Sequence, residues 1–126
     1  MKAVDHVAIG VKDLDERIAF FTNAMSMHLI RIGTHFASGG RIAMLADPSG
    51  FKLELIENGS DQPMLMHLAY RVDDVDAEYA ELVSSGCESI RGPHELTAAK
   101  ATTALVQDPA RLQIQLISYA PDSPDL

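Results

Sequence analysis

The sequence predicts an α+β fold made of two tandem βαβββ modules, each a copy of one ancestral half. Three observations predict it: a repeat at a fixed offset of 61 residues, the same order of apolar patterns in both halves, and an Asp-Pro turn that recurs before the last strand. Identities at this offset occur near both ends of each half. They include His6 with His67, Asp13 with Asp74, Asp47-Pro48 with Asp108-Pro109, and Leu55-Ile56 with Leu116-Ile117.

The first half is expected to contain a strand, a helix and three further strands. Residues 4–9 alternate in the manner of a half-buried strand, with His6 and Ala8 on one face. Asp13 is the expected helix cap, and Glu16 completes a capping-box pattern. Leu14, Ile18, Phe21 and Met25 recur at helical spacing and predict a core-facing stripe. The further strands are expected over His28–Gly33, Arg41–Ala46 and Phe51–Glu57.

The second half repeats this plan. Its strands are expected over Met64–Val72, Ser89–Arg91, Ala101–Gln107 and Leu112–Ser118, with a helix over Val75–Ser85. The 126 residues form one domain, with module one over about residues 1–57, a polar Gly/Pro linker over 58–63 and module two over about 64–119. Residues 120–126 are expected to be a loose C-terminal tail.

Composition excludes several classes of protein. The formal net charge of −8 opposes binding to nucleic acid or to an anionic membrane surface. No apolar run is long enough to span a bilayer, and the first residues lack a signal-peptide pattern, so a cytoplasmic protein is expected. Cys87 is the only cysteine, which rules out an intrachain disulfide and an all-thiolate metal site.

Four polar residues occupy matched positions in the two halves. His6 and His67 lie in the first strands, while Glu54 and its repeat partner Gln115 lie in otherwise apolar last strands. Related by a pseudo-two-fold axis, the four side chains are expected to converge on one cation. Imidazole and oxygen ligands suit Zn, Ni, Co, Fe or Mn, and the alternative for each histidine alone is a hydrogen-bonded core residue.

The motifs in this pattern resemble those of the vicinal oxygen chelate superfamily, which includes glyoxalase I, methylmalonyl-CoA epimerase, extradiol dioxygenases and bleomycin resistance proteins. The resemblance rests on residues 6–11 with Asp13-Leu14, the Phe20-Phe21 pair, and residues 47–50 running into residues 53–56. It covers nearly the whole chain. It implies a cupped eight-stranded mixed sheet, usually in a homodimer, and one divalent metal ion held by the positions of His6, Glu54, His67 and Gln115.

One ligand departs from the glyoxalase I pattern of His, Glu, His, Glu. Gln115 can offer an amide oxygen to a metal, but it cannot act as a base near neutral pH. Glu54 is therefore the candidate catalytic base, and a one-base proton shuttle is favoured over a two-base inversion. Glyoxalase I enzymes also have an arginine four residues after the first ligand, where this chain has Gly10. That difference puts glutathione in doubt as a substrate component.

Two residues are candidates for substrate binding. Asn58 lies four residues after the second ligand and matches an asparagine of glyoxalase I enzymes. Arg71 lies four residues after His67 and is a candidate for holding a carboxylate, the alternative being an ion pair at the surface.

The leading function is a metal-dependent lyase or isomerase of the glyoxalase I type, acting on a small oxygen-chelating substrate through an enediolate. One alternative is a metal-free protein that sequesters a drug or metabolite, as bleomycin resistance proteins do. Against it, the chain has no Trp and only 6% aromatic residues with which to stack a ligand. A third reading, an Fe(II) dioxygenase using the two histidines and Glu54, ranks lower.

Overall fold

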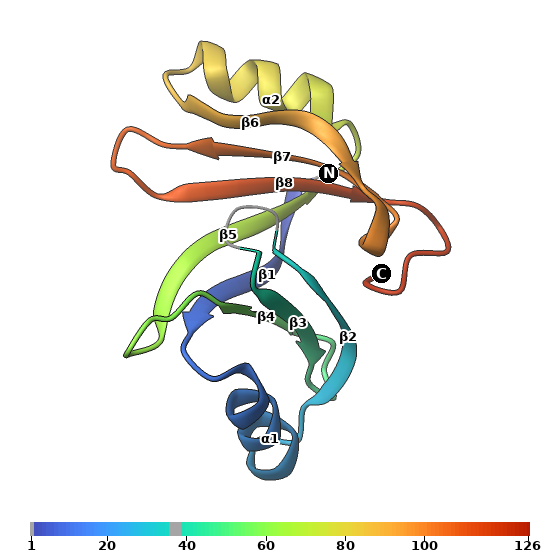
Figure 1. The fold of residues 1–126 in the computed structure, drawn as a ribbon. Coiled ribbons are helices and arrows are strands. Elements are labelled where there is room, and N and C mark those ends of the chain that lie inside the picture. The colour runs from blue at the N-terminus through green and yellow to red at the C-terminus, as the bar shows by residue number, and fades with distance from the viewer. Residues whose placement is uncertain (1, 36–38) are drawn as a thin grey trace. The chain divides into compact units, whose positions relative to one another are not determined.

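The computed structural model describes residues 2–35 and 39–126 and contains two βαβββ modules in tandem (Figure 1). Within each module the first and last strands pair in parallel, and the other neighbouring strands pair antiparallel. The predicted α+β fold of duplicated modules is thus confirmed. By their internal contacts, the residues separate into two compact units: His6–Met66, and the residues through Asp5 together with His67–Leu126.

Module one has the strand order β2-β3-β4-β1, and helix α1 covers one face of these strands. Its elements are β1 (Lys2–Val11), α1 (Leu14–Ala24), β2 (His28–Thr34), β3 (Arg41–Ala46) and β4 (Lys52–Glu57). Because β1 and β4 run parallel, their connection has to cross the module, and α1, β2 and β3 make that crossing.

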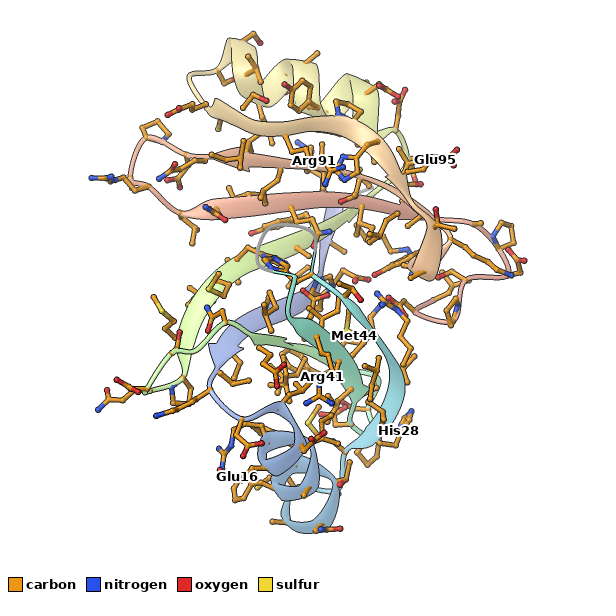
Figure 2. All side chains as sticks on the ribbon, viewed as in Figure 1. Glu16, His28, Arg41, Met44, Arg91 and Glu95 are labelled. Carbon is orange, nitrogen blue, oxygen red and sulfur yellow. The ribbon has the colours of Figure 1, made fainter. Side chains whose placement is uncertain are left out.

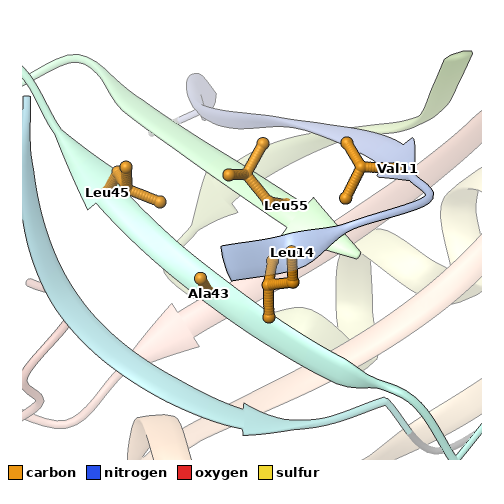
Figure 3. Close-up of a cluster of buried hydrophobic side chains, with 5 residues drawn as sticks. All are labelled: Val11, Leu14, Ala43, Leu45 and Leu55. Atoms are coloured by element: carbon orange, nitrogen blue, oxygen red, sulfur yellow. The ribbon is translucent and has the colours of Figure 1, made fainter. Parts of the chain in front are cut away.

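The start and packing of α1 follow from its sequence. The Asp13 carboxylate accepts a hydrogen bond from the Glu16 backbone N–H at 3.0 Å, as expected of a cap. Leu14 is fully buried with four residues of the strands, which Figure 3 shows as one cluster: Val11, Ala43, Leu45 and Leu55. Ile18 and Phe21 pack against that cluster, but Met25, predicted to complete the stripe, is 52% exposed. Met25 is the C-cap residue, with non-helical φ and ψ of −115° and 15°, so the helical spacing does not continue through it.

Module two repeats the design in the order β5-β8-β7-β6. Its elements are β5 (Met64–Val72), α2 (Val75–Ser84), β6 (Glu88–Leu96), a 3₁₀ turn η1 (Thr97–Ala99), β7 (Ala101–Gln107) and β8 (Gln113–Tyr119). The Asp74 carboxylate caps α2 through the Ala77 N–H at 3.1 Å. Strand β6 is longer than predicted and is irregular, with two register shifts. Within the described residues, neither helix has the length and apolarity needed to cross a membrane.

The C-terminal segment is packed, so the prediction of a loose tail is wrong. Ser123 and Asp125 are buried, the Ser123 hydroxyl donates to the Ala99 carbonyl, and the Ala120 N–H donates to the Lys100 carbonyl at 2.8 Å. The Lys100 ammonium also bonds the Asp122 carboxylate at 2.7 Å. These contacts join residues that are about 20 positions apart in the chain, so the composition of the segment alone gave no sign of them and suggested a loose tail.

Candidate functional site

His6 and Glu54 are placed together by the parallel pairing of β1 with β4. In this register Ala8 faces Glu54 and His6 faces Lys52, so His6 and Glu54 are diagonal neighbours on one face of the strands. That face is opposite to α1, because the intervening Leu53 and Leu55 pack toward the helix. His6 is 1% exposed and Glu54 is 8% exposed, and their ligand atoms lie within 4.8 Å of each other. A nitrogen and an oxygen donor thus meet in a largely dry environment.

The second module repeats this placement with the parallel pair β5 and β8. Ala69 faces Gln115, as Ala8 faces Glu54. His67 precedes Ala69 by two residues on β5 and is half-buried. The equivalence of His6 with His67, and of Glu54 with Gln115, therefore extends from sequence offset to strand register.

The Gln115 amide is oriented by a residue that the sequence analysis missed. Its Nε2 donates to the Thr103 Oγ1 at 2.9 Å, and the Thr103 hydroxyl donates to the Leu116 carbonyl at 2.8 Å. Because the nitrogen is engaged, the amide oxygen faces away from Thr103. Among the residues that the structure describes, this buried Oε1 has no hydrogen-bond partner. A buried acceptor left over in this way fits a cation ligand.

An aspartate turn sets the start of each last strand. The Asp47 carboxylate accepts hydrogen bonds from the Ser49 hydroxyl at 2.7 Å and from the backbone N–H groups of Ser49 and Phe51, both at 2.9 Å. The Ser49 hydroxyl bond, with backbone bonds adding to it, lowers the pKa of Asp47. In module two the Asp108 carboxylate accepts from the Leu112 N–H at 2.9 Å. Both turns precede the strand that carries Glu54 or Gln115, so they help to fix its register.

Two basic residues share the face of His6 and Glu54, and the sequence analysis missed both. Lys52 precedes Glu54 by two residues, faces His6 in the register and is only 8% exposed. Arg31 on β2 pairs with Met44 on β3 (labelled in Figure 2). Met44 pairs in turn with Glu54 on β4, so the three residues lie on one face. Strand alternation could have revealed Lys52. Arg31 is shifted in register by an irregularity between Leu29 and Arg31, which alternation does not predict.

The two predicted substrate-binding residues have neighbours within their own units. The Asn58 carbonyl oxygen accepts from the Ser60 N–H at 3.1 Å and from the Ser60 hydroxyl at 2.7 Å. A Cβ built on Gly10 would lie 2.4 Å from the Asn58 Nδ2. The Asn58 amide thus fills the space beside Gly10, where glyoxalase I enzymes carry an arginine.

Arg71 lies in module two over the ring of Tyr119, with 5.8 Å from its Cζ to the ring centroid. The Tyr119 hydroxyl donates to the Asp5 carboxylate at 2.5 Å. By offset, Arg71 and Tyr119 are the repeat partners of Gly10 and Asn58. The substrate-binding roles of Asn58 and Arg71 remain predictions.

The fold and the repeated histidine and oxygen-donor positions define a two-module βαβββ protein with a candidate metal centre. The chain matches the Glyoxalase/Bleomycin resistance protein/Dioxygenase superfamily over residues 3–116. It belongs to that superfamily, as its motifs predicted.

Solved structures share this fold. A methylmalonyl-CoA epimerase from Mycobacterium tuberculosis is 27% identical, with a TM-score of 0.78, over 94% of this chain and 88% of that one. A methylmalonyl-CoA epimerase in complex with methylmalonyl-CoA and NH4+ is 19% identical, with a TM-score of 0.81, over 98% of both chains. A hypothetical protein from Bacillus halodurans C-125 is 18% identical, with a TM-score of 0.80, over 97% of both chains. A comparison with curated proteins gives no match.

Proposed function

We propose that this protein is a metal-dependent isomerase or lyase that moves a proton at a carbon next to a carbonyl group of a small oxygen-chelating substrate. In this proposal His6, Glu54, His67 and Gln115 hold one divalent ion, and Glu54 is the base. The observation that carries it is the donor set itself. Each module places a histidine and an oxygen donor at register-equivalent positions, and the Gln115 oxygen is buried without a hydrogen-bond partner among the described residues.

The donors suit Ni, Co, Zn, Fe or Mn, since two imidazoles and two oxygens are ligands of intermediate hardness. When bound, such an ion would draw electron density from the substrate oxygens and so acidify the neighbouring C–H bond. Thr103 would help to hold the Gln115 amide in the orientation that offers its oxygen rather than its nitrogen. Outer contacts of this kind commonly tune metal affinity about 10- to 100-fold.

Glu54 would take the proton from carbon and return it. A carboxylate has two oxygens, so one can serve as a ligand while the other carries the proton. The Gln115 amide cannot accept a proton near neutral pH, which leaves one base in the donor set. A single base favours return of the proton on the face from which it left.

Several superfamily reactions fit this scheme, and two observations help to choose among them. The structural neighbours named as methylmalonyl-CoA epimerases favour methylmalonyl-CoA as a substrate for proton transfer, whereas the single base favours return of the proton on one face over inversion of the carbon. The Asn58 side chain occupies the space next to Gly10, which argues against a glyoxalase I-like lactoylglutathione lyase that anchors glutathione there. A homodimer is expected from the superfamily resemblance.

Metal content tests the donor set. Protein purified without a metal-affinity tag should contain, or bind on titration with Co(II) or Ni(II), about one ion per chain. The variants His67→Ala and Glu54→Gln should lose most of it. His94→Ala is the control, because the His94 ring bonds the Gly92 carbonyl at 2.8 Å on β6 and lies outside the donor set. Less than about 0.2 ion per chain with every metal tried would contradict the proposal and favour a metal-free binding protein.

Proton transfer tests the chemistry. Under nitrogen in D₂O, NMR would follow deuterium uptake at the reacting carbon of methylmalonyl-CoA and of the glutathione hemithioacetal of methylglyoxal. Uptake from either substrate supports an isomerase or lyase, and Glu54→Gln should slow it by about 10²- to 10⁴-fold. Turnover that requires oxygen would instead indicate a dioxygenase.

A further inference from the structure

We infer that Arg71 binds the carboxylate of a small acidic substrate on the face of module two opposite α2, and that Tyr119 positions the Arg71 guanidinium for this contact. This inference rests on the proposed function, and it names the class of substrate and the group that holds its acid end. All residues of the inferred site lie in one compact unit, which comprises the residues through Asp5 and His67–Leu126.

Strand register places Arg71 on the same face as the candidate ligand Gln115. Ala69 on β5 pairs with Gln115 on β8, and Arg71 pairs with Ile117 two residues further along both strands. Tyr70, between Ala69 and Arg71, packs against the buried cluster that includes the start of α2, so it takes the other face. Neighbouring strands are about 4.8 Å apart and residues along a strand about 3.3 Å, which puts the Cα atoms of Arg71 and Gln115 roughly 8 Å apart.

The hydrogen-bond donors of the Arg71 guanidinium are available to a ligand. The side chain is half-buried, and among the residues that the structure describes it takes part in no hydrogen bond and no ion pair. It interacts electrostatically with Asp73, but that residue is exposed, where water and salt weaken the attraction between charges. An arginine fork binds a carboxylate through two parallel hydrogen bonds. A half-buried fork without a protein acceptor therefore fits the carboxylate of a ligand.

The Tyr119 ring supports the Arg71 guanidinium. The Arg71 Cζ lies 5.8 Å from the ring centroid, within the range of a cation–π contact. Such a contact uses the face of the ring and leaves the N–H donors of the guanidinium to bind another group. The ring is itself fixed at two places. Its hydroxyl donates to the Asp5 carboxylate at 2.5 Å, and its body packs against the buried cluster that includes Ile117. Tyr119 is thus a fixed support that can orient Arg71.

The equivalent position in module one cannot take this role. Gly10 and Asn58 are the repeat partners of Arg71 and Tyr119. A Cβ built on Gly10 would lie 2.4 Å from the Asn58 Nδ2, so the amide leaves no room there for a side chain. The Asn58 oxygen already accepts two hydrogen bonds from Ser60. Of the two equivalent positions, that of module two carries the cation, and the acid group of the substrate is assigned to it.

The surface between Gln115 and Arg71 suits a ligand with a short apolar part. Ala69 and Ile117, which separate the two side chains, are 0% and 1% exposed, and neither offers a polar side-chain group. A ligand whose carboxylate bonds Arg71 and whose second oxygen lies toward Gln115 would place a few carbons over these apolar residues. Succinate has this arrangement, and it serves as the probe.

The test of the carboxylate contact is calorimetric titration of the intact protein with succinate, using succinamide as the neutral analogue of similar shape. Succinate should bind the wild-type protein, and succinamide should bind at least about tenfold more weakly. Arg71→Gln should weaken succinate binding about tenfold or more, the usual effect of losing one charge-assisted contact. Arg71→Lys keeps the charge without the fork and should restore only part of the affinity. Arg17→Gln is the matched control, because Arg17 also lies over an aromatic ring, that of Phe20 at 4.8 Å, but on α1 of module one.

Two substitutions of Tyr119 test its positioning role. Tyr119→Leu removes the ring and should weaken succinate binding about fivefold or more. Tyr119→Phe keeps the ring and should bind succinate within about twofold of the wild type. Both variants lose the hydrogen bond to Asp5, so both should have a lower melting temperature. Recovery of affinity by Tyr119→Phe alone therefore separates positioning of Arg71 from a loss of stability.

Unchanged succinate affinity in Arg71→Gln, equal binding of succinamide, or no succinate binding by the wild type with and without Co(II) would each overturn the carboxylate site. Equal affinities of Tyr119→Leu and Tyr119→Phe would overturn the positioning role. If a Tyr119 variant folds poorly by circular dichroism, Arg71→Gln still gives an independent answer on the site. Titrating Co(II) into the same samples separates this inference from the proposed function. Failure of the wild type to bind Co(II) would contradict the metal centre, whereas the comparison of succinate affinities would still test Arg71.

Discussion

Replacing Gly10 by alanine tests the close packing of β1 against the segment that follows β4. The new Cβ would lie 2.4 Å from the Asn58 Nδ2, 2.8 Å from its Oδ1 and 2.9 Å from its Cγ. These distances are far below van der Waals contact, so the amide has to move. The Asn58 amide oxygen accepts hydrogen bonds from the Ser60 N–H and hydroxyl, and the amide nitrogen donates to the Met66 Sδ at 3.3 Å. Movement of the amide therefore breaks or weakens these contacts.

The expected loss in the free energy of unfolding follows from these contacts. Each hydrogen bond from Ser60 is worth about 1 kcal/mol, and crowding a packed site costs about 1–3 kcal/mol. Replacing a strand glycine by alanine restores about 0.4–1 kcal/mol by restricting the unfolded chain. Gly10→Ala should therefore destabilise the protein by about 2–4 kcal/mol. In an Asn58→Ala background, where the amide is gone, the same substitution should be close to neutral.

Urea unfolding followed by far-UV circular dichroism measures both values, since the chain has no tryptophan for fluorescence. The control is Gly92→Ala on β6, where the Tyr79 hydroxyl, at 3.8 Å, is the one described side-chain atom within 4 Å of a new Cβ. That substitution should change stability by less than about 1 kcal/mol. Equal destabilisation by Gly10→Ala with and without the Asn58 amide would refute the reasoning, because the double-mutant cycle would then show no coupling.

Three further predictions concern the core, the acid response and the metal centre. Leu55→Ala should cost about 2–5 kcal/mol in urea unfolding, because Leu55 is fully buried, and a cost below about 1 kcal/mol would contradict its place in the core. Hydrogen bonding to Arg41 lowers the pKa of Glu57, so this pair stabilises the folded state above the ordinary glutamate pKa and the stabilisation is lost as the pH falls through the lowered value. Arg41→Met should accordingly reduce the drop in melting temperature between about pH 6 and pH 3, and identical profiles would contradict the link. Thr103→Val should weaken Co(II) binding about tenfold by releasing the Gln115 amide, with Gln115→Glu as the comparison that keeps an oxygen donor.

Much of the fold was predictable because the same order of strand and helix patterns occurs in both halves of the sequence. The caps Asp13 and Asp74 were readable from local pattern, since a capping bond spans only three residues. Met25 was wrongly placed in the core because helical spacing does not show where the helix ends. The β6 strand was predicted too short because its irregular pairing with β7 obscures alternation.

The sequence by itself determined the duplication, the module plan and the identity of the four candidate ligands, because these depend on periodicity and on residues at one fixed offset. Tertiary structure decided which side chains meet. Strand register placed Lys52 beside His6 and Arg31 opposite Met44, and a hydrogen bond across strands turned the Gln115 amide toward Thr103. It also packed the C-terminal segment through Ser123. The physical reason is that register and turn geometry set contacts between residues far apart in the chain, which no local pattern encodes.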